Sequence, residues 1–139
     1  MIVLDTNVIS ALMRAERERV VVGWLDGASV EPCWTTAITI LEVASGLALL
    51  PDGRRRAELE REFGNVVEVD LQGRVLDFDR KAAEAAAELI ATARRAGRAL
   101  EIRDAQIAGI VTARRATLAT RNTRDFAPLG VATVDPWTA

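Results

Sequence analysis

Short β-branched and apolar runs alternate with longer helical segments along the whole chain. The runs with strand composition are Ile2–Leu4, Glu31–Trp34, Ala116–Thr120 and Val131–Val134. Strands that alternate with helices over 139 residues indicate an α/β sandwich with a mainly parallel sheet. A chain of this length can bury one hydrophobic core, so we expect a single domain over residues 1–139.

Helical composition fills most of the intervals between these runs. The expected helices cover about Glu16–Leu25, the segment from Thr35 or Thr36 to near Pro51–Gly53, a charged segment through about Phe63, the alanine-rich segment Arg80–Ala96, and about Arg103–Arg115. At least one of Val66–Val69 and Val75–Phe78 should be a strand. We expect Arg121–Gly130 to be the loop between the last two strands.

The sequence contains no histidine, and this absence excludes several classes of hydrolase. A Ser-His-Asp triad, a Cys-His pair, a histidine zinc site and histidine cleavage of RNA cannot be built. Cys33 is the only cysteine, so one chain can form neither a disulfide nor a thiolate zinc site. Any hydrolysis must therefore use carboxylates and a metal ion.

Charge and hydropathy give no overall sign of a nucleic acid or membrane partner. The net charge is −2, whereas electrostatic binding of phosphate usually appears as a basic surplus. Phosphate binding by local basic patches, such as Arg54–Arg56, stays a possibility. The apolar runs are far shorter than a membrane span, and the first residues lack the features of a signal peptide. We expect a cytoplasmic protein with no membrane partner.

Asp5 directly follows the first predicted strand. In parallel sheets, ligands bind beyond the carboxyl ends of the strands, so Asp5 occupies a position typical of functional residues. A simple turn or N-cap aspartate before Asn7 is an equally acceptable interpretation of the position alone.

Glu42 lies on a helix with a predicted apolar stripe and a small, polar neighbouring face. We expect the stripe to contain Ala37, Leu41, Ala44 and Leu47 or Ala48, and the polar face to contain Thr35, Thr39, Glu42, Ser45 and Gly46. A carboxylate beside a core face needs a partner or a metal, because uncompensated burial of charge is costly. The alternative is an ordinary exposed helical glutamate.

Three further polar residues are candidates for the same site. Asp104 begins a helix, where the helix dipole is a sufficient structural reason for an aspartate. Ala108 and Gly109, one turn later, would allow another element to approach closely. Asn122 and Asp125 follow a predicted strand and offer oxygen ligands, although loops favour both residue types anyway.

Four segments, taken together, resemble the PIN domain family. They are Ile2–Ile9, Thr39–Glu42, Arg103–Ala108, and Thr120–Phe126 followed by Asp135-Pro136-Trp137. The likeness spans the whole chain and is greatest to the VapC/FitB-like toxins of bacterial toxin–antitoxin pairs. It implies a three-layer α/β/α sandwich with a mainly parallel central sheet.

The resemblance also implies an activity and its residues. It implies an endoribonuclease dependent on Mg²⁺ or Mn²⁺, usually a homodimer, which a cognate antitoxin inhibits by covering the site. The family's first three acidic positions correspond to Asp5, Glu42 and Asp104, which would hold the metal, and Thr6 would be a supporting hydroxyl. Some relatives have a fourth acidic residue where this chain has Asn122, with Asp125 three positions later. An amide can orient water but brings no charge, so the number of bound metals is open.

The sequence disfavours two other functional classes, phospho-receiver domains and nucleotide-binding proteins. A phospho-receiver domain would need a lysine near a late strand, and the only lysine, Lys81, lies in a predicted helix. A nucleotide-binding protein would need a glycine-rich phosphate loop, which is absent. The alternative that stays is a PIN-like module that binds RNA or a protein partner without cutting.

Overall fold

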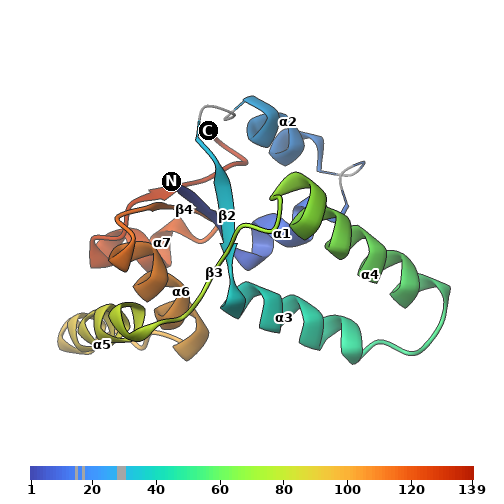
Figure 1. Ribbon diagram of the computed structural model, residues 1–139. Coiled ribbons are helices and arrows are strands. Elements are labelled where there is room, and N and C mark those ends of the chain that lie inside the picture. The colour runs from blue at the N-terminus through green and yellow to red at the C-terminus, as the bar shows by residue number, and fades with distance from the viewer. Residues whose placement is uncertain (15, 17, 28–30) are drawn as a thin grey trace.

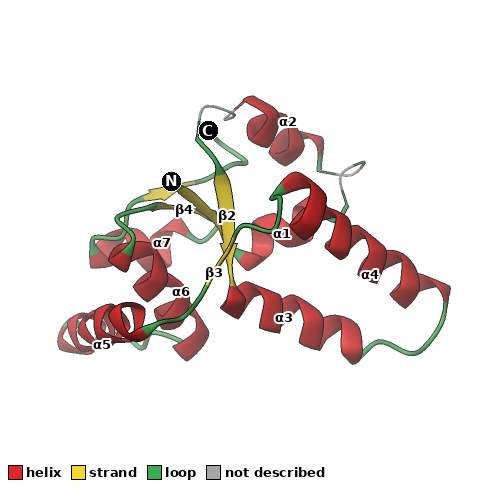
Figure 2. Ribbon diagram, in the orientation of Figure 1, coloured by secondary structure: helices red, strands yellow, loops and turns green. Residues whose placement is uncertain are grey.

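The computed structural model describes residues 1–14, 16, 18–27 and 31–139. Figures 1 and 2 show a central sheet with helices packed on both sides. The strands are β1 (Ile2–Leu4), β2 (Cys33–Thr36), β3 (Val75–Leu76), β4 (Thr117–Ala119) and β5 (Thr133–Val134). The α-helices are α1 (Thr6–Leu12), α2 (Arg19–Gly27), α3 (Ala37–Ala48), α4 (Arg54–Asn65), α5 (Arg80–Arg95), α6 (Ile102–Ala113) and α7 (Thr123–Phe126).

The sheet has the strand order β3-β2-β1-β4-β5, and every pairing is parallel. The expected α/β class with a parallel sheet is therefore confirmed. Strand β1 is central, since Ile2 pairs with Cys33 of β2 on one side and with Thr117 of β4 on the other. The carboxyl ends of β1, β2 and β4 therefore lie side by side, and each carries polar residues, since Asp5 follows β1, Thr35 and Thr36 end β2, and Thr120 follows β4.

Two hydrophobic clusters cover the two faces of the sheet. Val3 belongs to a cluster with residues of α5, α6 and α7, whereas Leu4 belongs to a cluster with residues of α1, α2 and α3. This separation follows from the alternation of side chains along a strand. The molecule is thus a sandwich of three layers, as the resemblance implied (Figure 1).

Of the predicted apolar stripe of α3, Leu47 is buried as expected, whereas Leu41 and Ala44 are exposed. The buried residues are Ile38, Thr39, Val43 and Leu47, whereas Leu41 is 57% exposed. The hydroxyl of Thr36 caps α3 by accepting from the Thr39 amide at 3.1 Å, as one of the two proposed caps. The buried face of α3 packs against both hydrophobic clusters of the sheet. The spacing of apolar residues along the sequence does not indicate these contacts.

Two segments differ from the predicted secondary structure. Val66–Asp70 forms a π-helical turn, because Val66, Val67 and Leu71 are the buried positions and this spacing is helical. β3 is the strand that the sequence allowed in this region. The predicted loop 121–130 contains α7 and a 3₁₀ turn at Ala127–Leu129, because the fully buried Phe126 must reach the core.

The segment around Val20–Leu25 forms most of α2. Val21 is fully buried, Val22, Trp24 and Leu25 pack against the core, and Val20 is exposed. The apolar run is therefore explained by core packing. The predicted helix from Glu16 begins at Arg19 in the structure, and residue 17 lies outside the described part of the chain.

Gly109 is the point of closest approach between α5 and α6. A Cβ atom at this position would lie 2.4 Å from the carbonyl oxygen of Ala82 and 2.8 Å from the Cβ of Ala86. The small residues of α6 thus serve helix packing and not the site directly. No helix among the described residues is both long enough and apolar enough to span a membrane.

Candidate functional site

Asp5 lies at the carboxyl end of β1 and begins α1. The Thr6 amide donates to its Oδ1 at 2.8 Å, and the Thr120 hydroxyl donates to its Oδ2 at 2.7 Å. Burial raises the pKa of the Asp5 carboxyl above its usual value, although both hydrogen bonds act in the opposite direction. Asp5 is therefore an N-cap and also a buried carboxylate at the edge of the sheet.

Glu42 lies on α3 and is partly buried. Burial is the largest cause that raises the pKa of its carboxyl, and the charges of Asp5 and Glu101 raise it further. Arg103 and a hydrogen bond from the Thr6 side chain lower it. Glu42 is thus not an ordinary exposed helical glutamate, since it is partly buried and the charge of Asp5 raises its pKa.

Asp104 lies in the first turn of α6, and its pKa is raised to about 6. Burial is the largest cause, followed by the charges of Asp5, Glu101, Glu42 and Asp125. A helix N-terminus by itself favours an ionised carboxylate and would lower the pKa. Burial and the neighbouring carboxylates therefore outweigh the helix dipole, so the dipole alone does not account for this aspartate.

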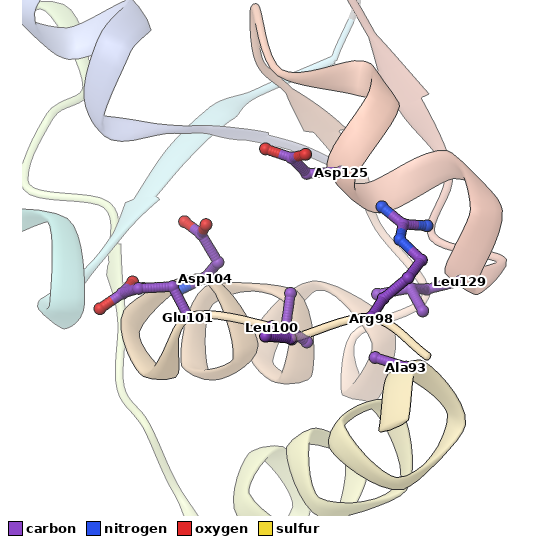
Figure 3. Close-up of a pocket in the computed structure, with 8 residues that line it drawn as sticks. Ala93, Arg98, Leu100, Glu101, Asp104, Asp125 and Leu129 are labelled. Atoms are coloured by element: carbon purple, nitrogen blue, oxygen red, sulfur yellow. The ribbon is translucent and has the colours of Figure 1, made fainter. Parts of the chain in front are cut away.

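Asp104 and Asp125 face one pocket of about 190 Å³, which Figure 3 shows between α6 and α7. The pocket is also lined by Ala93, Arg98, Ala99, Leu100, Glu101 and Leu129. Asn122 precedes α7, and its main-chain amide donates to the Thr120 hydroxyl at 3.0 Å. Its side chain does not cap α7. Of these two candidates, only Asp125 adds charge beside Asp104.

Thr6 contacts two of the carboxylates, since its main-chain amide donates to Asp5 and its side chain hydrogen-bonds to Glu42. Its Oγ1 lies 3.2 Å from the hydroxyl of Thr39, which is buried on α3. The Thr39 hydroxyl in turn lies 3.4 Å from that of Thr36. This row of hydroxyls links the beginning of α1 to the helix that carries Glu42.

Two residues of the site were not predicted from the sequence. Glu101 is the N-cap of α6, since its Oε2 accepts from the Arg103 amide at 3.0 Å and the Asp104 amide at 3.2 Å. Glutamate is not among the residues preferred at N-caps, so no cap pattern before Ile102 indicates it. Thr120 is fully buried at the end of β4. It begins the segment Thr120–Phe126 that resembles the family, but the sequence does not indicate its contact with Asp5, because the two residues are 115 positions apart.

Glu42 lines a second pocket, of about 290 Å³. Its polar lining includes Arg14, Arg55 and Arg103, and its apolar lining includes Met13 and Leu59. Asp104 thus lines a pocket with two further carboxylates, whereas Glu42 lines a pocket with three arginines. The described residues contain no group of three or more His, Cys, Asp or Glu side chains that could hold a metal ion as they stand.

The chain is similar to known proteins over nearly its whole length. The PIN domain family model matches residues 2–130. The VapC ribonuclease Y4jK of Sinorhizobium fredii is 40% identical over 99% of this chain and 98% of that protein. The toxin FitB of Neisseria gonorrhoeae is 35% identical over 99% of each. A solved structure of FitAB bound to an IR36 DNA fragment superposes with a TM-score of 0.87 at 35% identity, covering 99% of this chain and 96% of that one.

The fold and the comparisons agree with the resemblance inferred from the sequence motifs. The matched region contains β1, β2 and β4 and all the acidic residues described above. Two relatives exceed 30% identity while nearly every residue is aligned. The chain belongs to the PIN domain family.

Proposed function

We propose that this protein is the toxin of a toxin–antitoxin pair and that it cleaves RNA as an endoribonuclease dependent on Mg²⁺ or Mn²⁺. The observation that carries the proposal is the mutual influence of three carboxylates at the carboxyl edge of the sheet. Asp5 and Glu42 both raise the pKa of Asp104, and Asp5 also raises that of Glu42. The names of the similar proteins, a VapC ribonuclease and a toxin, support the same activity.

The donor set fits a hard divalent cation. Carboxylate oxygens are its preferred ligands, and Mg²⁺ takes one or two of them while it keeps several waters. A closed cage of protein ligands is therefore not required. Repulsion among Asp5, Glu42 and Asp104 would fall when a cation neutralises them. When bound, the cation supplies an activated water and stabilises negative charge on the scissile phosphate.

The residues have distinct roles in this proposal. Asp5 and Asp104 hold the cation, and Glu42 is a further ligand or the base that orients water. Thr6 supports Glu42 by hydrogen bonding. Asn122 and Asp125 complete the site on the α7 side. Asn122 orients water through its amide and Asp125 adds negative charge.

The substrate would approach from the side of the arginines. The guanidinium groups of Arg14, Arg55 and Arg103 surround the pocket next to Glu42 and match phosphate oxygens in geometry. Carboxylates without a cation would repel the same phosphates. Single-stranded or looped RNA is the expected substrate, because base pairing blocks access to the bases.

The proposal includes two protein partners. We expect a homodimer in the cytoplasm and a cognate antitoxin that covers the site, as the resemblance to toxin–antitoxin pairs implies. The similar structure of FitAB with DNA supports an assembly that contains more than the toxin.

Cleavage of total RNA by the purified, antitoxin-free protein tests the activity. We expect cuts at defined positions with Mg²⁺ or Mn²⁺ and none with EDTA. Asp5→Asn and Asp104→Asn should each lower the rate by about 100-fold or more, because each removes a charged ligand. Asp52→Asn is the matched control, since Asp52 is exposed and lies before α4.

The same experiment separates the enzyme from a PIN-like binding module. If the folded wild type binds RNA equally well with EDTA and cuts nothing with either metal, then the binding module is correct. If it cuts and Asp5→Asn cuts as fast, the assignment of the carboxylates is wrong.

A further inference from the structure

The Thr120 hydroxyl is the centre of a small buried hydrogen-bond network. Its oxygen accepts from the Asn122 amide at 3.0 Å and from Nδ2 of Asn7 at 3.3 Å, and it donates to Oδ2 of Asp5 at 2.7 Å. Thr120 is fully buried, and its main-chain amide donates to Val134 of β5 at 2.9 Å. The position of this hydroxyl is therefore fixed by the sheet.

The direction of the Thr120 proton follows from counting donors and acceptors. A hydroxyl has one proton and two acceptor positions. The two N–H donors fill both acceptor positions, so the proton is left for Asp5. The orientation of the Asn7 amide is also fixed, because its Oδ1 accepts from the main-chain N–H of Arg121 at 3.2 Å. The amino group of Asn7 must then face Thr120.

This network fixes the orientation of the Asp5 carboxylate. Oδ2 accepts from Thr120 and Oδ1 accepts from the Thr6 amide, so the carboxylate is held at both oxygens. Each oxygen keeps a further acceptor position, and the plane of the group cannot rotate without breaking a buried hydrogen bond. Outer hydrogen-bond partners of this kind orient the ligands of metal sites.

We propose that Thr120 and Asn7 are positioning residues that orient Asp5 for a divalent cation, with Asn7 acting through the Thr120 hydroxyl. This inference rests on the proposed function, since it needs a cation at Asp5. It assigns a role to two uncharged side chains, one of which is held by the main chain of the segment that leads into α7. Asn7 thereby connects the α7 side of the site to the first turn of α1.

The test is titration of Mn²⁺ into the metal-free protein by calorimetry, with no RNA present. Thr120→Val keeps the shape of the side chain and removes the hydroxyl, so Mn²⁺ should bind about 10-fold more weakly or worse. Thr120→Ser keeps the hydroxyl and should restore the affinity. Asn7→Leu leaves the net charge unchanged and removes the N–H donor to the Thr120 hydroxyl. It should therefore weaken Mn²⁺ binding by less than Thr120→Val does.

Thr117→Val is the matched control, because Thr117 lies on the same strand and its side chain is not part of the network. Thermal unfolding of each metal-free variant separates loss of fold from loss of orientation. If Thr120→Val is unstable, the folded pair Thr120→Ser and Asn7→Leu decides the question.

Two results would overturn the inference. The first leaves the proposed function intact, and the second overturns both. If the wild type binds Mn²⁺ and Thr120→Val binds it within about twofold, orientation by Thr120 is wrong while the proposed function stands. If the wild type shows no saturable Mn²⁺ binding and no metal-dependent cleavage, the inference and the proposed function both fail.

Discussion

The ionised carboxyl of Asp104 destabilises the fold of the metal-free protein. Its pKa is raised to about 6 by burial and by four neighbouring carboxylates, so at neutral pH it is ionised in surroundings that disfavour the charge. In the unfolded chain the same carboxyl would have its usual value of 3.8. Ionised Asp104 therefore destabilises the metal-free fold above about pH 6, and this cost disappears as the pH falls toward 4.

Asp104→Asn should consequently stabilise the metal-free protein at neutral pH. We expect a gain of about 1 kcal/mol at pH 7.5, a value reduced from the full shift because the site is partly open to solvent. The corresponding rise in Tm is about 3 °C. The gain should vanish near pH 4, where the wild-type carboxyl is protonated. Calorimetric melting of both proteins at the two pH values, with EDTA, measures this, and a Tm difference that is the same at both would contradict it.

The acidic residues were predictable individually, whereas their partners were not. Asp5, Glu42 and Asp104 occupy positions with a local meaning, such as the end of a strand or the first turn of a helix. Thr120 and Glu101 gain their roles from contacts with Asp5 and Asp104 that only the folded chain creates. The identity of a hydroxyl at the end of β4 carries no such signal by itself.

At the scale of elements, α5 and α6 show how closely two helices can pack when small residues face each other. Gly109 lies against the main chain of Ala82 and the side chain of Ala86. α6 also carries Asp104, so its distance from α5 helps to set the depth of the acidic pocket.

Gly109→Ala should therefore be strongly destabilising although alanine favours helices. The added methyl group would meet a carbonyl oxygen, and overpacking of this kind costs about 1–3 kcal/mol or more. Gly23→Ala in α2 is the control, since nothing lies near its Cβ position and the change should stabilise by about 0.5–1 kcal/mol. Urea unfolding of the two variants compares them. A neutral Gly109→Ala would mean that the helices separate without cost.

The order of strands and helices could be read from the sequence because composition reports local preference. The alanine-rich segment Arg80–Arg95 is helical, as expected from its propensity. The buried face of α3 and the helical turn of α7 could not be read in this way. They depend on where Thr39 and Phe126 meet the rest of the core, and a linear pattern does not contain that information.

At the scale of the whole molecule, the C-terminal segment is attached to the N-terminal half by Trp137. The indole Nε1 donates to Glu18 at 3.2 Å, and the guanidinium of Arg121 lies 4.3 Å from the ring centroid. The ring also packs against the cluster that contains Leu4. One side chain thus joins the segment after β5 to the residue before α2 and to the segment that follows β4.

Trp137→Ala should lower the free energy of unfolding by about 2 kcal/mol, because apolar contact and the cation–π interaction are lost together. Trp137→Phe keeps a ring and loses the indole hydrogen bond, so about 1 kcal/mol is expected. Chemical denaturation of the two variants measures both values. Equal losses would assign the whole contribution to Glu18.

The position of β1 in the middle of the sheet has a consequence for synthesis. Asp5 precedes Thr120 by 115 residues in the chain, yet its strand pairs with β4, and its carboxylate accepts a hydrogen bond from the Thr120 hydroxyl. A ribosome that has reached only α5 has therefore made the strand but none of the partners on that side. The carboxylate site can form only after β4 and Thr120 have emerged from the ribosome, so under the proposed function a chain that ends before β4 would not cut the messenger from which it is being translated.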